Sequence, residues 1–349
     1  MRVGLSLLTL VPGLSGGSET YVRELVRSLA RNGRHEYRVF LPSIATDVTE
    51  LPAEVVHEYG ASRETPGRIV AMVRASAFGG RIRRRFAGLD AVHFPLTVMI
   101  PRVEDRPSVT TVLDIQHEFL PQFFSRAELF YRRRVYGSSI RHSRLIVTIS
   151  RHAATTLVER VGVPEDRVRP IHLGLDHDVF RPGQDARGEF LLYPAREWPH
   201  KNHARLFEAY AELRRRHPGL DLVLTSYDGA LPDGVRSLGR VSHPELARLY
   251  RTAAALVFPS LYEGFGQPPL EAMACGCPVA CSDVASLPEV VGDAARLFDP
   301  TSVEDIVAAV EDVLAEPESW RRRGLARASQ FSWDATAAAH DEVYAELAA

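Results

Sequence analysis

The feature that most constrains this chain is an alternation of short apolar runs with amphipathic segments of helical length along its 349 residues. Strands that alternate with helices build parallel sheets covered by helices on both faces, so we predict an α/β protein. The expected strands are residues 3–9, 37–41, 91–94, 109–113 and 145–149 in the first half, and 190–193, 221–225, 255–258, 278–281 and 296–298 in the second.

The length predicts two domains, because single hydrophobic cores stop growing well below this size. A segment rich in Gly, Pro and charge interrupts the alternation at residues 174–188. We predict an N-terminal Rossmann-like domain over 1–175, a linker over 176–188 and a C-terminal Rossmann-like domain over 189–331. Residues 332–349 are expected to form a final helix, and its packing back onto the N-terminal domain stays open.

Local signals predict where several helices begin. A helix is expected over residues 18–31 with Ser18 as its N-cap. Capping boxes are expected at Ser242/Glu245 and Thr301/Glu304.

Composition excludes some classes of function. The net charge of −2 and the absence of a mixed basic and aromatic face argue against nucleic acid as a partner. No apolar run reaches the roughly 20 residues of a membrane span, and the first residues read as a strand, so a cytoplasmic protein is expected. The three cysteines, Cys275, Cys277 and Cys281, are expected to pack as small hydrophobic residues.

Two basic clusters leave a contact with membranes open. Arg81–Arg85 and Arg132–Arg134 lie on predicted helices of the N-terminal domain. A solvated face is one interpretation, and peripheral contact with anionic headgroups at the inner face of the membrane is the other.

The most informative segment runs from Pro259 to Val279, where a strand is followed by a glycine turn and then a helix. Glycines 264 and 266 let backbone N–H groups approach a ligand, and the helix N-terminus favours an anion. Glu263 and Glu271 flank the turn, and carboxylates accept hydrogen bonds from vicinal sugar hydroxyls. The segment therefore predicts a site for a phosphate and a sugar.

The same run resembles the Glu-x7-Glu signature of glycosyltransferase family 4, and the resemblance continues through Cys277-Pro278-Val279 and residues 286–290. It implies the GT-B architecture, in which two Rossmann-like domains face each other across a cleft. It also implies that Glu263 contacts the transferred sugar and Glu271 the ribose. The diphosphate and sugar hydroxyls would be bound by the backbone of Gly264, Phe265, Gly266 and Gln267.

A second motif follows the first strand of the C-terminal domain. Arg196 and Lys201 are five residues apart, and both side-chain types bind phosphate, Arg as a fork and Lys as a point charge. The pair resembles the Arg-x4-Lys pair of the family. That resemblance implies that both residues neutralise the departing diphosphate.

The opening turn of the N-terminal domain, from Gly13 to Thr20, is placed like a Rossmann phosphate loop. It lacks the glycine spacing of a dinucleotide site, which disfavours a nicotinamide-dependent dehydrogenase. By the family resemblance Gly16 and Gly17 contact the diphosphate and the acceptor, whereas a tight turn without a ligand is the alternative.

Candidate polar groups of the N-terminal domain are His93, Asp114 and His117. Asp114 and His117 follow a predicted strand on the ligand side of the sheet. Family members often carry a His-Asp pair here, whereas this chain has Leu113-Asp114. His117 is therefore the candidate for part of the catalytic role.

No metal or other cofactor is expected. Asp176-His177-Asp178 matches the Asp-x-Asp pattern of metal-dependent glycosyltransferases, but it lies in the predicted linker and offers few oxygen ligands. Positive charge would come from Arg196, Lys201 and the helix N-terminus.

Together these features and the family resemblance predict a metal-independent glycosyltransferase that moves a hexose or deoxyhexose from a nucleotide-diphosphate sugar. The resemblance implies that the anomeric configuration is retained. GDP-mannose is the first guess for the donor. The acceptor is a glycan, a lipid-linked or a small molecule. Two alternatives stay open, namely a sugar-nucleotide epimerase of the same fold and a non-catalytic protein that binds nucleotide sugars.

Overall fold

The computed structural model describes residues 1–14 and 16–348. The chain divides into two compact units. The first unit comprises Met1–Gly174 together with the C-terminal helix α13 (Trp333–Ala348), and the second comprises Leu175–Ser332. The predicted linker, residues 176–188, falls within the second unit.

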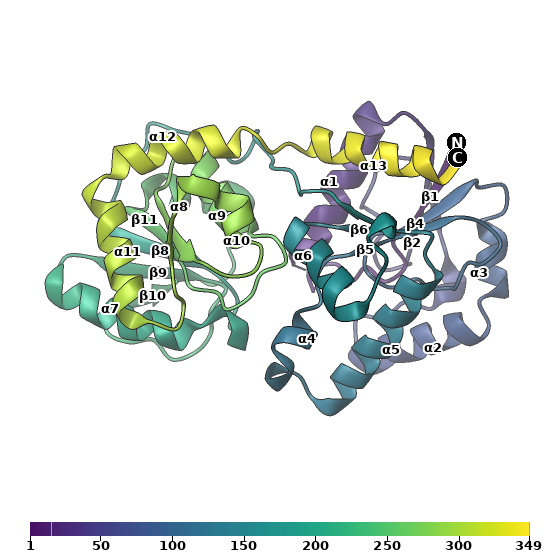
Figure 1. The fold of residues 1–349 in the computed structure, drawn as a ribbon, viewed down its shortest axis with the longest axis horizontal. Coiled ribbons are helices and arrows are strands. Elements are labelled where there is room, and N and C mark those ends of the chain that lie inside the picture. Colours follow the sequence, from purple (N-terminus) through teal and green to yellow (C-terminus); the bar gives the residue numbers. More distant parts are fainter. Residues whose placement is uncertain (15, 349) are drawn as a thin grey trace. The chain divides into compact units, whose positions relative to one another are not determined.

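The first unit is built on a parallel sheet, which has seven strands in the described part of the chain (Figure 1). Its order is β3-β2-β1-β4-β5-β6-β7, so the direction in which strands are added reverses between β1 and β4. The strands are β1 (Arg2–Ser6), β2 (Glu36–Leu41), β3 (Ala53–Val55), β4 (Ala91–Phe94), β5 (Ser108–Val112), β6 (Leu145–Thr148) and β7 (Val168–Pro170).

Helices connect these strands and cover both faces of the sheet (Figure 1). The α-helices are α1 (Gly17–Asn32), α2 (Thr65–Ala77), α3 (Gly80–Arg85), α4 (Gln116–Phe119), α5 (Arg126–His142) and α6 (Arg151–Thr156). Short turns of other helix types are η1 (His57–Tyr59), η2 (Pro121–Phe123), η3 (Leu157–Val161) and η4 (Glu165–Arg167).

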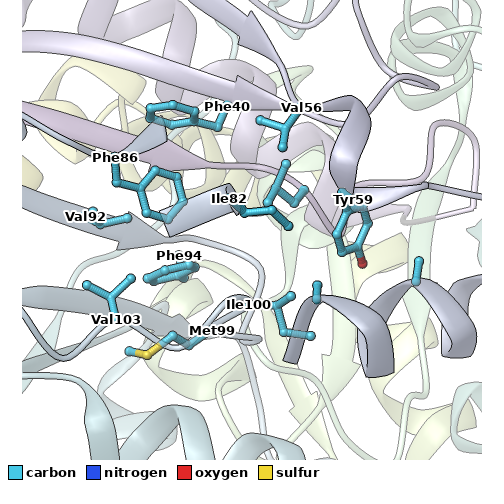
Figure 2. Close-up of a cluster of buried hydrophobic side chains, with 13 residues drawn as sticks. Phe40, Val56, Tyr59, Ile82, Phe86, Val92, Phe94, Met99, Ile100 and Val103 are labelled. Atoms are coloured by element: carbon cyan, nitrogen blue, oxygen red, sulfur yellow. The ribbon is translucent and has the colours of Figure 1, made fainter. Parts of the chain in front are cut away.

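A buried hydrophobic cluster joins the sheet to the helices on one face. Figure 2 shows Phe86 between Phe40 and Phe94, with ring centroids 4.7 Å from Phe40 and 6.5 Å from Phe94. Ala71 and Ala75 bring helix α2 onto this cluster. Burial of these aromatic rings fixes α2 and α3 against the sheet.

Helix α13 crosses α1 and packs against it in the first unit (Figure 1). Tyr344 of α13 hydrogen-bonds the Nδ1 atom of His93 at 2.8 Å, and the Tyr21 hydroxyl lies 3.0 Å from Nε2 of His340. These polar pairs are buried, so α13 is bound by specific hydrogen bonds as well as by apolar packing.

The second unit also contains a parallel sheet, with six strands among the described residues in the order β10-β9-β8-β11-β12-β13. The reversal lies between β8 and β11. Its strands are β8 (Phe190–Pro194), β9 (Asp221–Thr225), β10 (Val235–Ser237), β11 (Ala255–Phe258), β12 (Val279–Ser282) and β13 (Arg296–Phe298). Its helices are η5 (Pro199–Lys201), α7 (His203–Arg216), α8 (His243–Thr252), α9 (Gln267–Ala274), α10 (Leu287–Val291), η6 (Gly292–Ala294), α11 (Val303–Ala315) and α12 (Pro317–Ala328).

The structure corrects two of the predicted helix starts. Gly16 and not Ser18 is the N-cap of α1, because the left-handed φ of 52° at this residue is available to glycine. Ser302 and not Thr301 caps α11, because the Thr301 hydroxyl bonds Asp299 at 2.7 Å. Ser242 caps α8 as predicted.

No helix among residues 1–14 and 16–348 is long and apolar enough to span a membrane.

Candidate functional site

The candidate donor site lies at the carboxyl ends of β8 and β11 in the second unit. These strands flank the reversal of strand order, where the loops diverge and leave room for a ligand in open α/β sheets. Arg196 and Lys201 follow β8, and Glu263 follows β11. The topology therefore brings together residues that are more than 60 positions apart in the sequence.

The two loops are pinned to each other by backbone and side-chain hydrogen bonds. The Leu261 N–H donates to the His200 carbonyl at 2.7 Å. Asn202, in the left-handed region at φ 60°, donates its side-chain amide to the carbonyl groups of Pro259 at 3.1 Å and Pro300 at 2.8 Å. The Tyr193 hydroxyl donates to the Lys201 carbonyl at 2.6 Å. The position of Lys201 is thus fixed by its surroundings.

Lys201 and Glu263 form the central contact of the site. The ammonium Nζ of Lys201 lies 2.5 Å from Oε1 of Glu263, and the two side chains are 12% and 13% exposed. Nζ also lies 5.5 Å from the centroid of the Phe258 ring. At such low exposure the pair is poorly screened by water, so each charge orients the other.

Lys201 is also the only lysine in the sequence, in which lysine and arginine together number 42. A compact ammonium binds one phosphate oxygen as a point charge, whereas a guanidinium needs a planar partner and more space. The occurrence of a single lysine could therefore have indicated from the sequence that this position has a specific role.

Arg196 and His200 complete the cationic side of the site. The guanidinium of Arg196 lies 5.5 Å from the Trp198 ring, and Trp198 is half exposed. Burial, reinforced by the Lys201 charge, lowers the pKa of His200 to about 4. His200 is therefore neutral at pH 7, which leaves Arg196 and Lys201 as the cations of these loops.

The glycine turn leads into helix α9. Gly266 adopts φ 120° and ψ 47°, and a Cβ atom there would lie 2.8 Å from Cδ2 of Leu287. The Ser286 hydroxyl lies 2.9 Å from the Glu263 carbonyl oxygen and 2.6 Å from that of Phe265, which holds the turn in place. Pro268 and Pro269 have no N–H group, so the backbone N–H groups of this turn are those of residues 264–267.

Glu271 lies apart from the Lys201–Glu263 pair, on the buried side of α9. It is 8% exposed, and its Oε2 accepts a hydrogen bond from the Tyr250 hydroxyl at 3.0 Å. Burial raises the pKa of Glu271 to about 7, and the Tyr250 hydrogen bond opposes this shift. Among the described residues, Tyr250 is the one hydrogen-bond partner of this carboxyl group, which leaves its other oxygen available to a ligand hydroxyl.

In the first unit, the predicted glycine loop precedes α1. Gly16 is the N-cap and Gly17 the first helical residue, while Ser15 lies outside the described residues. Glu19 accepts a hydrogen bond from the Gly13 N–H at 2.7 Å, which closes the loop on itself. A Cβ atom at Gly17 would meet no atom within 4 Å, so this position is open.

Asp114 and His117 follow β5 in the same unit. Asp114 accepts the Gln116 N–H at 2.9 Å and so fixes the turn into α4. The His117 ring is buried 5.4 Å from the Tyr136 ring, and its Nδ1 has no hydrogen-bond partner among the described residues. Burial lowers the pKa of His117, and the nearby Glu118 opposes the shift.

His93 has a structural place in the core. Its two ring nitrogens lie 2.8 Å from the Tyr344 and Thr111 hydroxyl groups. Complete burial lowers its pKa well below the ordinary value. With both nitrogens occupied, His93 links α13 to the sheet.

Within residues 1–14 and 16–348, no three His, Cys, Asp or Glu side chains are grouped so that they could bind a metal ion. Asp176 instead accepts the N–H groups of Asp178 and Val179, and His177 bonds the Phe331 carbonyl. The three cysteines are buried as predicted.

Tyr250, Ser286 and Asn202 were not identified as site residues from the sequence, although Ser286 lies in the matching run. Each orients another residue through a contact distant in sequence. No spacing rule reveals such partners.

The family model "Glycosyltransferase Family 4" matches residues 15–179, and "Glycosyl transferases group 1" matches 176–328. An O-antigen chain mannosyltransferase B from Escherichia coli is 36% identical, over 91% of this chain and 93% of that protein. The chain belongs to glycosyltransferase family 4. It is a glycosyltransferase.

Solved structures share the fold over nearly the whole chain. A sucrose-phosphate synthase from Thermosynechococcus elongatus superposes with a TM-score of 0.79 at 21% identity, covering 99% of each chain. The Anabaena protein Alr3699/HepE, solved with UDP and glucose, gives a TM-score of 0.74 at 17% identity over 99% of this chain and 100% of that one. These matches establish the α/β GT-B fold that the sequence predicted.

Proposed function

We propose that this family member is a retaining, metal-independent mannosyltransferase that uses GDP-mannose as its donor. The single observation that carries the proposal is the Lys201–Glu263 pair at the strand reversal of the second unit. An ammonium that can neutralise a diphosphate stands beside a carboxylate that can accept sugar hydroxyls. The 36% identity to a mannosyltransferase over nearly the full length supports mannose as the sugar.

In this proposal Lys201 and Arg196 stabilise the charge that develops on the leaving diphosphate. The N–H groups of residues 264–267 add donors to the same phosphates, and Glu271 accepts the ribose hydroxyls. Glu263 orients the transferred sugar. The leaving phosphate helps to remove the proton of the attacking hydroxyl group, and configuration at the anomeric carbon is retained.

The residues of the first unit are proposed to act on the acceptor. His117 and Asp114 follow β5 on the ligand edge of that sheet, and Gly16 and Gly17 form its first loop. The acceptor is proposed to be a glycan, a lipid-linked or a small molecule. Asp114 acts by positioning the α4 turn that carries His117.

A lipid-linked acceptor would require a peripheral contact with the membrane, and we propose the outer face of α2 for it. Ile69, Val70 and Val73 are more than half exposed on this helix. Residues 65–86 contain six arginines and no acidic residue. Exposed apolar side chains beside basic ones fit an anionic bilayer. We expect the protein to co-sediment with phosphatidylglycerol vesicles but not with phosphatidylcholine vesicles, and this measurement tests the membrane contact.

The experiment that tests the donor is a thermal-shift screen of GDP, UDP, dTDP and ADP sugars with and without EDTA. A ligand at 100 times its Kd stabilises the folded state by about 2.7 kcal/mol. We expect GDP-mannose to raise the Tm with EDTA present. Absence of a shift with every sugar nucleotide would remove the donor proposal, and a shift abolished by EDTA would remove metal independence.

Two other functions are separated by turnover. An epimerase would convert GDP-mannose without an acceptor, and a non-catalytic protein would bind it without transfer. The expected result is transfer that depends on an added acceptor, with the product linkage assigned as axial or equatorial by NMR.

A further inference from the structure

A cavity of about 310 Å³ opens in the first unit, in the part of the chain that the structure describes. Leu8, Leu96 and Leu113 line it just beyond the carboxyl ends of β1, β4 and β5. Because strand order reverses between β1 and β4, the cavity occupies the ligand edge of this sheet. Its volume is within the range of small-molecule sites.

The charged groups of the cavity are all of one sign. Arg68 enters from α2 and Arg132 from α5. No aspartate or glutamate is found among the described residues that line the cavity, and neither arginine forms a salt bridge with a described carboxylate. Two guanidinium groups on separate helices thus face a common space without a protein anion to neutralise them.

One of these arginines is held in place by aromatic rings. The Arg132 guanidinium lies 4.7 Å from the Phe124 ring centroid and donates to the Tyr136 hydroxyl at 3.3 Å. Stacking on a ring leaves the edge N–H groups of a guanidinium available to a ligand. Arg132 is therefore oriented before any ligand binds.

Hydroxyl groups surround the two arginines. Tyr59, Tyr131 and Tyr136 line the cavity. The Tyr131 hydroxyl donates to the Sδ atom of Met72 at 3.1 Å, and burial raises the pKa of Tyr131 to about 12. Further hydroxyl groups in the lining come from Thr9, Ser18, Ser62 and Thr97.

The backbone at the cavity floor is strained. Thr97 has φ 65°, a left-handed conformation that is an outlier for a β-branched residue. It is buried, and the Leu113 N–H donates to its hydroxyl at 3.4 Å. Strain of this kind persists where the surrounding structure holds it, and it clusters at ligand sites.

We propose that this cavity binds a phosphate ester carried by the acceptor, with Arg68 and Arg132 as the residues that select it. Guanidinium forks match phosphate oxygens, and the hydroxyl groups supply the remaining donors. Leu10, Ile44 and Met72 form the apolar wall for the carbon skeleton. The inference rests on the proposed glycosyl transfer, and the phosphate ester belongs either to a sugar or to a lipid.

The test measures binding to the full chain by isothermal titration, with inorganic phosphate, mannose 6-phosphate and geranyl phosphate as probes and mannose as the uncharged control. Saturating GDP is present throughout, so that the second unit does not take up the probes. The variants are Arg68→Gln and Arg132→Gln. Arg74→Gln on α2 and Arg134→Gln on α5 are matched controls, because both are exposed and neither lines the cavity.

At least one phosphate ester is expected to bind more tightly than mannose, and each cavity variant is expected to weaken that binding roughly tenfold or more, because a hydrogen bond to a charged group is lost. Mannose 6-phosphate as the tighter ligand indicates a sugar phosphate, and geranyl phosphate a lipid phosphate. Equal binding of mannose and the esters, or equal affinity in Arg68→Gln and Arg74→Gln, overturns the proposal.

A separate titration with GDP alone distinguishes this inference from the proposed function. GDP affinity reports on the donor site, and it should be unchanged in Arg68→Gln and Arg132→Gln, because these residues are not assigned to that site. Loss of GDP binding in the wild type would contradict the donor proposal and leave the phosphate result intact, provided that phosphate binding is then measured in the Lys201→Gln variant. An unchanged urea-unfolding transition shows that the first unit of a variant, which contains Arg68 and Arg132, is folded.

Discussion

The buried carboxyl group of Glu271 makes a specific prediction about stability and pH. Its pKa is about 7 in the folded protein against 4.5 ordinarily, so the folded state holds a proton that the unfolded state has released between these values. The contribution of this group to the free energy of unfolding is complete below pH 4.5. It decreases by about 1.4 kcal/mol per pH unit between pH 4.5 and pH 7 and is lost above pH 7. The total is roughly 3 kcal/mol.

Glu271→Gln removes the ionisation and keeps a hydrogen-bond acceptor for the Tyr250 hydroxyl. The assay is urea unfolding of both proteins at several pH values from 5 to 8. Between pH 5 and pH 8, we expect the free energy of unfolding of the variant to rise by about 2 to 3 kcal/mol relative to that of the wild type. Exposed Glu304→Gln is the control and should run parallel to the wild type.

The ligand provides the second readout. If the Glu271 carboxylate accepts the ribose hydroxyls, GDP favours the ionised form, and its affinity rises with pH up to about 7. Glu271→Gln should abolish this rise. Parallel stability curves for wild type and Glu271→Gln would refute the reasoning about burial, and parallel affinity curves would refute the role in ribose binding.

Three further predictions follow from single contacts. Glu263→Gln should lower the rate of transfer at least tenfold while GDP affinity stays within about threefold, because the carboxylate is assigned to the sugar. Steady-state rates and GDP titration measure the two quantities, and an equal loss in both would contradict the assignment. Gly266→Ala should cost about 1–3 kcal/mol in urea unfolding, since its φ is 120° and the new Cβ meets Leu287, whereas Gly17→Ala, with open space around it, should cost less than 1 kcal/mol. Tyr344→Phe should lower the free energy of unfolding by about 1–3 kcal/mol, because Nδ1 of buried His93 loses its partner, and GDP affinity should be unchanged. An unchanged free energy of unfolding would mean that this hydrogen bond is not needed to hold α13.

The central parallel strands could be predicted closely from sequence because they are buried on both faces, whereas the three-residue edge strands β3, β7 and β10 were not predicted. The predicted strands at 91–94 and 255–258 coincide with β4 and β11. Runs of apolar residues at such positions have one low-energy solution, a central strand under helices. Helix starts were less certain, because several hydroxyl groups compete for each cap, as Thr301 and Ser302 do.

The site was predicted as a set of residues but not as a geometry. Spacing indicated that Lys201 and Glu263 would follow strands, and the strand reversal then placed them 2.5 Å apart. Spacing could not indicate that Glu271 faces Tyr250 and not the other carboxylate, because that depends on how α9 packs against α8. His93 was a candidate polar group for the same reason, since its partner Tyr344 is 251 residues away.

Donor binding at Lys201 is the central claim of the proposed function, and the single lysine of the sequence allows this binding to be measured directly. Protein labelled with [ε-¹³C]lysine gives a single lysine signal in an NMR spectrum, because Lys201 is the only lysine. On titration with GDP-mannose in EDTA we expect this signal to shift and saturate, and Lys201→Gln to weaken binding of GDP-mannose roughly 10- to 100-fold. A signal that does not move at saturating GDP-mannose would contradict the assignment of the donor site.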